Sequence, residues 1–308
     1  MDYRFILSFL CCSAFFMKPC CSQDLKPGLT GMAPSKWITI KHTISPGKIY
    51  RSQSGPSQKY TQEDCYIRAW IPIMNKPNFA IVVGPHYRTE QLEFKSYGEN
   101  PIQQLSSWNL RSMGIDVKSF FKVNSNSYLV VASNINKSGN LTGESANKVP
   151  LNYSFTSVFM KKKSDRKEIG VGFMVSQGEN LTVLPVFVFN YNNPSGRSGI
   201  EIALPKKVAY RMNFSPKDII YLKSEASTKR YYTYGRDNQP TLFRLIDLDT
   251  GLQYNRQINK LIGLEIFGGY RTNISNRLPT GIIPVRTSGL AASLELYIRP
   301  PFKSKKQS

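Results

Sequence analysis

Residues 181–213 read LTVLPVFVFNYNNPSGRSGIEIALPKKVAYRMN and contain three short segments with the pattern of β-strands. Leu181 to Phe189 is an apolar run of strand length, and residues 191–196 that follow are rich in Asn, Pro, Ser and Gly, which favour turns. Apolar residues then occupy every second position from Ile200 to Leu204 and from Val208 to Met212. A period of two places alternate side chains on opposite faces of a strand. The stretch therefore predicts antiparallel hairpins.

The same unit of strand, polar turn and strand recurs along most of the chain. It is clear in residues 66–87, 113–132, 153–175 and 246–270, and a last alternating segment covers residues 292–299. We count about 14 strands, or 12 if the short ones near Trp37 and Val208 merge or stay outside the sheet. No helical period is sustained, and the apolar runs after residue 30 are far shorter than the about 20 residues that a transmembrane helix needs. The chain is predicted to be all-β.

Connections between the predicted strands alternate in length. Short turns at one end face longer polar segments at the other, apart from two short connections near Gly178 and Pro205. The longer segments are residues 44–64, 89–107, 139–151, 226–241 and 273–288. Short turns on one rim and longer loops on the other are typical of bacterial outer-membrane barrels. This layout predicts a transmembrane antiparallel up-and-down β-barrel of about 12–14 strands.

A soluble sandwich or lipocalin-like barrel would also alternate, with its apolar residues facing inward. Three features favour the membrane barrel instead. Many strands reach the roughly nine residues that cross a bilayer, and the last strand is followed only by a short tail, so it can close on the first. Aromatic residues also gather near strand ends, as interfacial girdles require: Trp37, Trp70, Tyr87, Trp108, Tyr153, Tyr254, Tyr270 and Phe302.

The predicted organisation has four parts. Residues 1–22 have a basic Arg4, an apolar core and small residues before the predicted cleavage point, as in a signal peptide for export. Residues 23–36 form an irregular segment, 37–302 the outer-membrane barrel, and 303–308 a basic tail. Four of the 5 cysteines leave with the leader and Cys65 stays alone, which excludes a disulfide within the mature chain.

The positive net charge of the chain bears on which molecules it can bind. The formal net charge is +21, but the basic residues are scattered over turns and loops, and a protein exported to the envelope does not meet nucleic acid. We expect outer-membrane lipid, the barrel-assembly machinery during biogenesis and small anions as partners, and no nucleic acid. The expected location is the outer membrane of a Gram-negative cell.

The sequence resembles a family of uncharacterised outer-membrane β-barrel proteins from Bacteroidota, a domain of unknown function. The resemblance covers roughly residues 35–300 and is strongest in LPVFVFN (184–190), GIEIALP (199–205) and VAYRMNFS (208–215). It implies a porin-like fold and an envelope location, and it brings no known catalytic or binding residues. The aromatic Phe302 departs from the usual barrel ending, because six residues follow it.

If the apolar positions face lipid, the charged residues of the other parity face the lumen. The candidate lumen-facing charges are Arg68, Asp116, Lys118, Glu168, Glu201, Arg211, Lys223, Glu225, Asp247, Asp249, Glu265, Arg271, Glu295 and Arg299, with His86 beside them. Two interpretations stay open. These charges form an ion-pair network that fills a narrow barrel, or they line a water-filled passage and set its ion selectivity. An open passage would favour anions, because the loops are basic.

Catalysis is not expected. The chain has 2 histidines, His42 and His86, and neither belongs to a motif for nucleophilic catalysis. With one remaining Cys they make no metal-ligand spacing, and no phosphate-binding glycine loop is present, so no cofactor is predicted. The leading hypothesis is a structural or passive-transport barrel. A soluble periplasmic or surface β-domain that binds a small ligand is the alternative, and an envelope-lipid or peptide hydrolase comes last.

Overall fold

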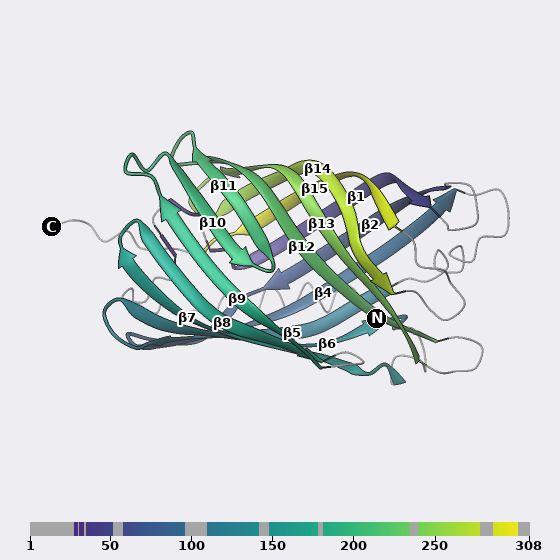
Figure 1. Cartoon of the computed structure of the whole chain (residues 1–308), viewed down its shortest axis with the longest axis horizontal. Helices are drawn as coiled ribbons and strands as arrows, with labels where there is room; N and C mark the ends of the chain where they lie inside the picture. The colour runs from purple at the N-terminus through teal and green to yellow at the C-terminus, as the bar shows by residue number, and fades with distance from the viewer. Residues whose placement is uncertain are drawn as a thin grey trace.

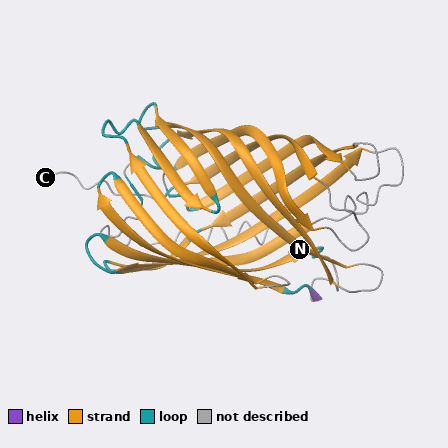
Figure 2. Ribbon diagram, in the orientation of Figure 1, coloured by secondary structure: helices purple, strands orange, loops and turns teal. Residues whose placement is uncertain are grey.

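The computed structural model describes residues 28–29, 31–33, 35–51, 58–95, 110–141, 148–177, 181–234, 240–277 and 286–300. Their strands lie side by side around a barrel, with short turns at its left end in Figures 1 and 2. The leader predicted at 1–22 and the tail predicted at 303–308 lie outside the described residues. The described part of the predicted irregular segment contains no strand, and the first strand begins at Ile38.

The strands follow one another along the chain, separated by turns and loops. They are β1 (Ile38–Arg51), β2 (Gln58–Ala69), β3 (Ile71–Lys76), β4 (Phe79–Lys95), β5 (Leu110–Lys122), β6 (Ser127–Gly139), β7 (Leu151–Ser164), β8 (Lys167–Gln177), β9 (Leu181–Asn192), β10 (Ser198–Leu204), β11 (Lys207–Asn213), β12 (Asp218–Tyr234), β13 (Pro240–Gln257), β14 (Ile262–Arg277) and β15 (Arg286–Ile298).

Pairing closes these strands into a ring. Apart from β2 and β3, each strand pairs antiparallel with the next one in the chain, and β1 pairs with both β15 and β2. Both β2 and β3 pair with β4, one after the other, so they are two halves of one strand interrupted at Trp70. The result is a closed antiparallel barrel of 14 strands, as the sequence predicts. Because a closed sheet has no edge strand, most of its backbone groups are satisfied within the wall.

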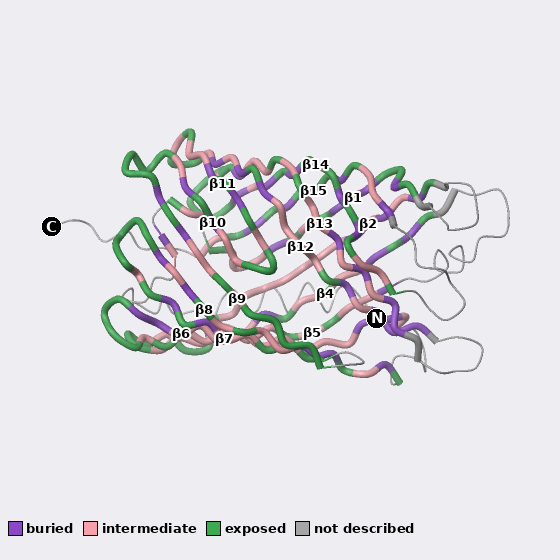
Figure 3. The backbone as a smooth tube through the Cα atoms, viewed as in Figure 1, coloured by how far each residue is buried: buried purple, intermediate pink, exposed green. Residues whose placement is uncertain are grey.

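The barrel is apolar outside and polar inside. On β14, Ile262, Ile266 and Tyr270 are exposed, whereas Glu265 and Arg271, at positions of the other parity, are buried. Figure 3 shows the same alternation of exposed and buried positions along most strands. Soluble proteins rarely expose a continuous apolar surface of this extent. The outward face is therefore the lipid-facing surface of a transmembrane barrel, and the inward face lines a lumen.

The outward face of β4 marks one limit of this apolar belt. Its outward residues are apolar or aromatic from Phe79 to Tyr87, and then Thr89, Gln91 and Glu93 follow. That length matches the about 9–11 residues of a strand that crosses the hydrocarbon layer. Beyond Tyr87 the strand continues as polar sheet above the membrane. No helix among the described residues is long and apolar enough to span a membrane.

The predicted loops at 44–64, 89–107, 226–241 and 273–288 are wider than the loops of the structure. In the structure β1 continues to Arg51, β4 to Lys95, β12 to Tyr234 and β14 to Arg277. Polar residues predominate at the outer ends of these strands, although Leu92 is buried and Ile49 and Ile274 are exposed, so we place these ends above the hydrocarbon layer. Apolar alternation ends there, although hydrogen bonding between the strands does not.

Trp70 is not part of an aromatic girdle, contrary to the prediction. Its ring lies on the lumen side above Gly84, where a Cβ atom would be only 2.7 Å from the ring. Trp70 follows Tyr66 and Arg68 in the alternation of β2, which places all three on the inner face. Of the other predicted girdle residues, Trp108 and Phe302 lie outside the described residues.

A charge placed in the lipid-facing belt should destabilise the barrel. We expect Leu294→Arg, on the outward face of β15, to lower the free energy of unfolding by about 2–4 kcal/mol. The matched change Ile258→Arg, in the exposed turn after β13, should cost at most about 1 kcal/mol. Both stability costs can be measured by electrophoresis without boiling, in which the folded, fast-migrating band disappears as guanidinium is increased. Equal costs would contradict the assigned lipid face.

Candidate functional site

The candidate site is the lumen, and its outer half is closed by a buried polar cluster. Lys229 of β12 reaches across the barrel and binds Asp64 of β2 at 2.8 Å and Glu90 of β4 at 2.9 Å. Glu90 also accepts hydrogen bonds from Tyr231 and Gln62. These contacts join strands on opposite sides of the barrel, with Lys229 and Asp64 separated by 165 positions in the chain. We call Gln62, Asp64, Glu90, Lys229 and Tyr231 the outer cluster.

The outer cluster continues along the neighbouring strands. Lys48 of β1 donates to Gln62 at 2.9 Å and lies 3.7 Å from Asp247 of β13. Asp247 also accepts a hydrogen bond from Asn273, at 3.1 Å. Arg271 holds Asp249 through two hydrogen bonds of 2.6 and 2.8 Å. Buried charges are tolerated when they are paired in this way, and the pairs bridge the strands that surround this level of the lumen.

The segment before β1 lies at the opposite end of the barrel. Lys36 binds Glu265 of β14 at 2.8 Å and also Glu295 of β15. The backbone N–H of Ala33 donates to the Tyr221 hydroxyl at 3.0 Å, and Ala33 packs against a buried cluster that includes Tyr221. The chain thus turns into the mouth formed by the short-turn rim. We call the described residues of 28–36 the inner plug.

The charge on Lys36 is well maintained. Burial alone disfavours a charged ammonium, but attraction to Glu265 and Glu295 outweighs this cost and raises the pKa of Lys36 above its ordinary value. Lys36 therefore stays protonated throughout the physiological pH range, and its ion pairs persist up to alkaline pH.

Two more carboxylates of the inner half are fully engaged. Glu201 of β10 binds Lys207 at 2.9 Å and Arg211 at 3.4 Å. Glu168 of β8 accepts hydrogen bonds from Tyr128 and, at 2.8 Å, from Asn190. Glu201 joins β10 to β11, and Glu168 joins β8 to β6 and β9. These contacts stiffen the wall near the short-turn end.

Between the outer cluster and the inner plug, the lumen wall is basic. Lys118 of β5 lies 4.5 Å from the Trp70 ring, and Arg68 lies 4.9 Å from the same ring. Lys118 and Lys41 make no ion pair with another described residue. Asp116 is already bound to Asn134 at 2.6 Å and to His86 at 3.3 Å. This middle part of the lumen therefore carries unneutralised positive charge.

The wall formed by β6–β9 differs, because part of its inner face is apolar. Val158 and Met160 are buried there against Tyr128, and Val130, Val186 and Val188 pack on them. Gly170 of β8 makes room for this group, since a Cβ atom on it would fall 2.1 Å from the Met160 sulfur. We call this surface the apolar inner patch. One side of the middle lumen is thus basic and another is hydrocarbon.

The structure places the charges that were predicted to face the lumen as follows. Buried on the inner face are Glu168, Glu201, Arg211, Lys223, Asp247, Glu265, Arg271 and Glu295. Partly buried on this face are Arg68, Asp116, Lys118, Glu225 and Asp249. Arg299 lies just beyond β15, where its backbone N–H bonds to Leu261. A role of these residues in ion selectivity stays a prediction.

Sequence reasoning missed most of the outer cluster and the inner plug. Gln62, Asp64, Glu90 and Lys229 fall within segments predicted to be loops, and Lys36 falls within the segment predicted to be irregular. Neither face of these segments is apolar, so no alternation reveals their inward side. One signal was available: Asp64 is an even number of positions from Arg68, and Glu90 from His86, so each pair lies on the same face of its strand.

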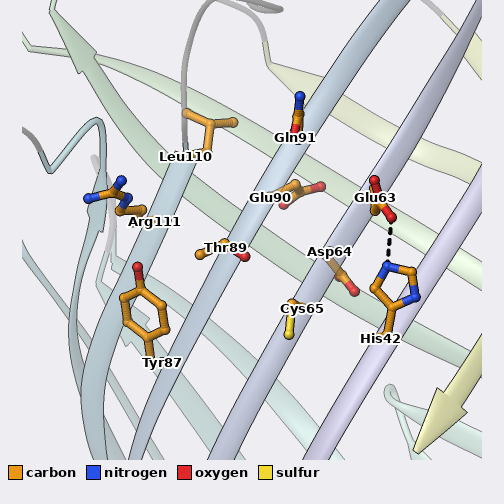
Figure 4. Close-up of a pocket in the computed structure, with 10 residues that line it drawn as sticks. All are labelled: His42, Glu63, Asp64, Cys65, Tyr87, Thr89, Glu90, Gln91, Leu110 and Arg111. Carbon is orange, nitrogen blue, oxygen red and sulfur yellow. Dashed lines mark hydrogen bonds and ion pairs between the residues drawn. The ribbon is translucent and has the colours of Figure 1, made fainter. Parts of the chain in front are cut away.

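A separate pocket of about 370 Å³ lies on the outer face of β1, β2, β4 and β5, at the upper limit of the apolar belt (Figure 4). His42 and Glu63 form an ion pair of 2.7 Å within it, and their side chains are 49% and 44% exposed. Cys65 lies directly opposite His42 in the strand register. Within the described part of the chain, no three His, Cys, Asp or Glu side chains are arranged to hold a metal ion.

Comparison with known proteins identifies a family. The family model described as "Domain of unknown function (DUF6268)" matches residues 104–278, more than half of the chain. No curated protein matches the sequence.

Among solved structures, a mutant of the monoaromatic hydrocarbon channel TodX is similar at a TM-score of 0.42 and 8% identity, covering 88% of this chain and 92% of that one. An outer membrane channel from Pseudomonas putida F1 is similar at a TM-score of 0.44 and 9% identity, covering 89% of this chain and 99% of that one. The translocator domain of the autotransporter NalP from Neisseria meningitidis is similar at a TM-score of 0.37 and 10% identity, covering 86% of this chain and 89% of that one. At these values the likeness concerns the barrel shape alone.

The outer cluster should contribute strongly to stability. Glu90→Ala removes the acceptor of Lys229, Tyr231 and Gln62, and we expect it to lower the free energy of unfolding by about 3–5 kcal/mol. Glu63→Ala makes the same change on the outer face of the adjacent strand and should cost no more than about 1 kcal/mol. Guanidinium titration followed by unboiled electrophoresis compares the two. A Glu90 variant as stable as the Glu63 variant would show that the cluster is not formed.

Proposed function

Since the chain belongs to the family described as a domain of unknown function (DUF6268), we propose its function from its own geometry: a non-catalytic outer-membrane barrel that admits small anions to a basic lumen and is closed at rest. The single observation that carries this proposal is the excess of positive charge in the middle lumen. Lys41 and Lys118 make no ion pair with a described residue, although paired charges lie on both sides of them.

Anion preference follows from the placement of these charges. A narrow lumen with walls of low dielectric constant concentrates the field of the charges that line it, and rings of Lys and Arg favour anions in pores. The basic face is contributed by β1, β2 and β5. The acids within reach are engaged by partners of their own, as Asp116 is with Asn134 and His86.

Closure at rest follows from the outer cluster and the inner plug. Both consist of hydrogen bonds and ion pairs in which side chains take part, and these exchange partners with water more easily than a covalent closure would. Passage of an anion along the barrel axis requires that Lys229 release Asp64 or Glu90 at the outer level. At the inner level, it requires that the segment carrying Lys36 leave the mouth.

The alternatives are weaker. A soluble ligand-binding domain requires the apolar face to point inward, whereas Leu294, Leu296 and Ile298 of β15 point outward and are exposed. A purely structural barrel would not need unpaired lysines in its lumen. A hydrolase would need an activated nucleophile, and His42 is engaged by Glu63, whereas His86 is engaged by Asp116.

The location and the remaining partners belong to the same proposal. The lipid-facing belt favours a membrane, and a strand-built wall favours the outer membrane, where barrels of this kind reside. Export by a signal peptide at 1–22 and insertion by the barrel-assembly machinery stay predictions.

The closures give a first electrical prediction. In planar bilayers the wild-type barrel should show small, rare openings, and Lys36→Ala should open more often because Glu265 and Glu295 lose the residue that holds the inner plug. Lys260→Ala in the β13–β14 turn is the matched control and should behave like the wild type. A Lys36 variant that conducts no better than the control would contradict closure by this segment.

The ion selectivity of the barrel gives a second electrical prediction. In a potassium chloride gradient the reversal potential should show preference for chloride, and Lys118→Glu should lower the chloride-to-potassium permeability ratio several-fold. Lys260→Glu makes the same charge change outside the lumen and should leave the ratio nearly unchanged. A cation-selective wild type, or a Lys118 variant without effect, would refute the proposed function.

A further inference from the structure

The pocket on the outer face, at the upper limit of the apolar belt, has no part in the proposed function. Its floor is one row of side chains across four strands: His42 of β1 pairs with Cys65 of β2, Cys65 with Thr89 of β4, and Thr89 with Arg111 of β5. The two middle side chains are small and the two outer ones are long. The resulting hollow of about 370 Å³ lies within the roughly 300–1,000 Å³ of small-molecule sites.

The next row of outward side chains, below the pocket, is apolar. Ile40 pairs with Ile67, Ile67 with Tyr87, and Tyr87 with Met113. Ile40 and Met113 are 49% and 48% exposed, so this row faces the hydrocarbon layer. Tyr87 marks the interface, where the aromatic residues of membrane barrels gather. The pocket is therefore at the depth of lipid headgroups, with a surface for acyl chains directly below it.

The pocket has an acid on one side and a base on the other. Figure 4 shows Glu63 with His42 at its right border and Arg111 at its left border, with Thr89 between them. Two interstrand spacings of about 4.8 Å separate the strands of Glu63 and Arg111. Among the described residues Arg111 forms no ion pair, and Glu63 is bound by His42 alone, at 2.7 Å. The two opposite charges therefore border one hollow without contacting each other.

The other acids beside the pocket are engaged elsewhere. Asp64 and Glu90 contribute to its lining, but their carboxylates accept hydrogen bonds from Lys229 on the inner face, at 2.8 and 2.9 Å. The pocket thus offers a ligand the guanidinium of Arg111 and the carboxylate of Glu63. A guanidinium binds phosphate through parallel N–H donors, and a carboxylate accepts hydrogen bonds from a primary ammonium. A ligand that satisfies both groups carries a phosphate and an ammonium a few atoms apart.

We propose that this pocket binds the phosphoethanolamine headgroup of one membrane lipid. The phosphate binds Arg111, the ammonium binds Glu63, and the acyl chains lie on the apolar row below. A phosphatidylglycerol headgroup lacks the ammonium, and the ammonium of phosphatidylcholine has no N–H to donate. The inference goes beyond the proposed function, because it concerns the outward wall of the barrel and does not require an open lumen.

Cys65 allows a direct test, because it lines the pocket and is the single cysteine among the described residues. The purified barrel is placed in vesicles of phosphatidylcholine, and part of this lipid is replaced by phosphatidylethanolamine or by phosphatidylglycerol. An uncharged, water-soluble maleimide is added, and mass spectrometry follows the rate at which it labels Cys65. The variant Cys65→Ser gives the background from any other thiol.

We expect phosphatidylethanolamine to slow the labelling of Cys65 several-fold, and phosphatidylglycerol at the same fraction to leave it nearly unchanged. Thr272→Cys in a Cys65→Ser background is the matched control position. It lies on the outward face just above Tyr270 of β14, as Thr89 lies just above Tyr87, but outside the pocket. Equal slowing at the control position would show a general effect of the bilayer and contradict binding in the pocket.

Variants of the two charged residues test the headgroup contacts. Arg111→Gln and Glu63→Gln should each remove the difference between phosphatidylethanolamine and phosphatidylcholine. Arg197→Gln and Asp165→Asn make the same changes in exposed turns at the short-turn rim and should keep the difference. Because the two lipids are compared within each variant, a change in the intrinsic reactivity of the thiol cancels. A difference that survives in both pocket variants would refute the proposed contacts.

The wild-type barrel decides the ligand class without any substitution. Protection of Cys65 by phosphatidylglycerol as strong as that by phosphatidylethanolamine would overturn the dipolar class. Labelling that does not depend on the lipid would overturn headgroup binding altogether. The chloride selectivity of the same protein reports on the proposed function separately, so failure of one proposal does not imply failure of the other.

Discussion

The structure depends on one constraint, which is that every backbone N–H and C=O within the hydrocarbon layer needs a partner. A strand cannot satisfy its own groups, so the strands must pair around a complete ring, and the pairing of β2 with β4 achieves this closure. Once the ring is closed, alternation along each strand divides the side chains between lipid and lumen. The apolar exterior and the charged interior both follow from that division.

The same constraint bears on the short hairpin of β10 and β11. It pairs with β9 only up to Phe187 and with β12 only up to Glu225. Beyond the hairpin, Arg230 of β12 donates to Ser176 of β8 at 3.2 Å, and Tyr232 pairs with Gly139 of β6. These contacts join β12 to the wall that the hairpin no longer reaches.

The lumen combines two arrangements that the sequence left open as alternatives. At its two ends the charges form the interlocked pairs of a filled barrel, as between Lys229 and Glu90 or between Lys36 and Glu265. In the middle, Lys118 and Lys41 keep their charge without an ion pair to a described residue. A charge that is paired contributes to stability and to closure, whereas an unpaired charge has a free energy of interaction left for a ligand.

The sequence by itself determined the class of fold, a range of about 12–14 strands and the side of the wall on which most charged residues lie, because a period of two is a local property. It did not reveal Asp64, Glu90 and Lys229 as one cluster. These residues lie beyond the apolar belt, where nothing in the local pattern separates inward from outward, and only closure of the barrel brings them together. The pairing of β12 with β6 beyond the short β10–β11 hairpin was equally hidden. Strand lengths can be estimated from sequence, but which edges remain unpaired depends on register and stagger around the whole ring, and these are set by tertiary structure.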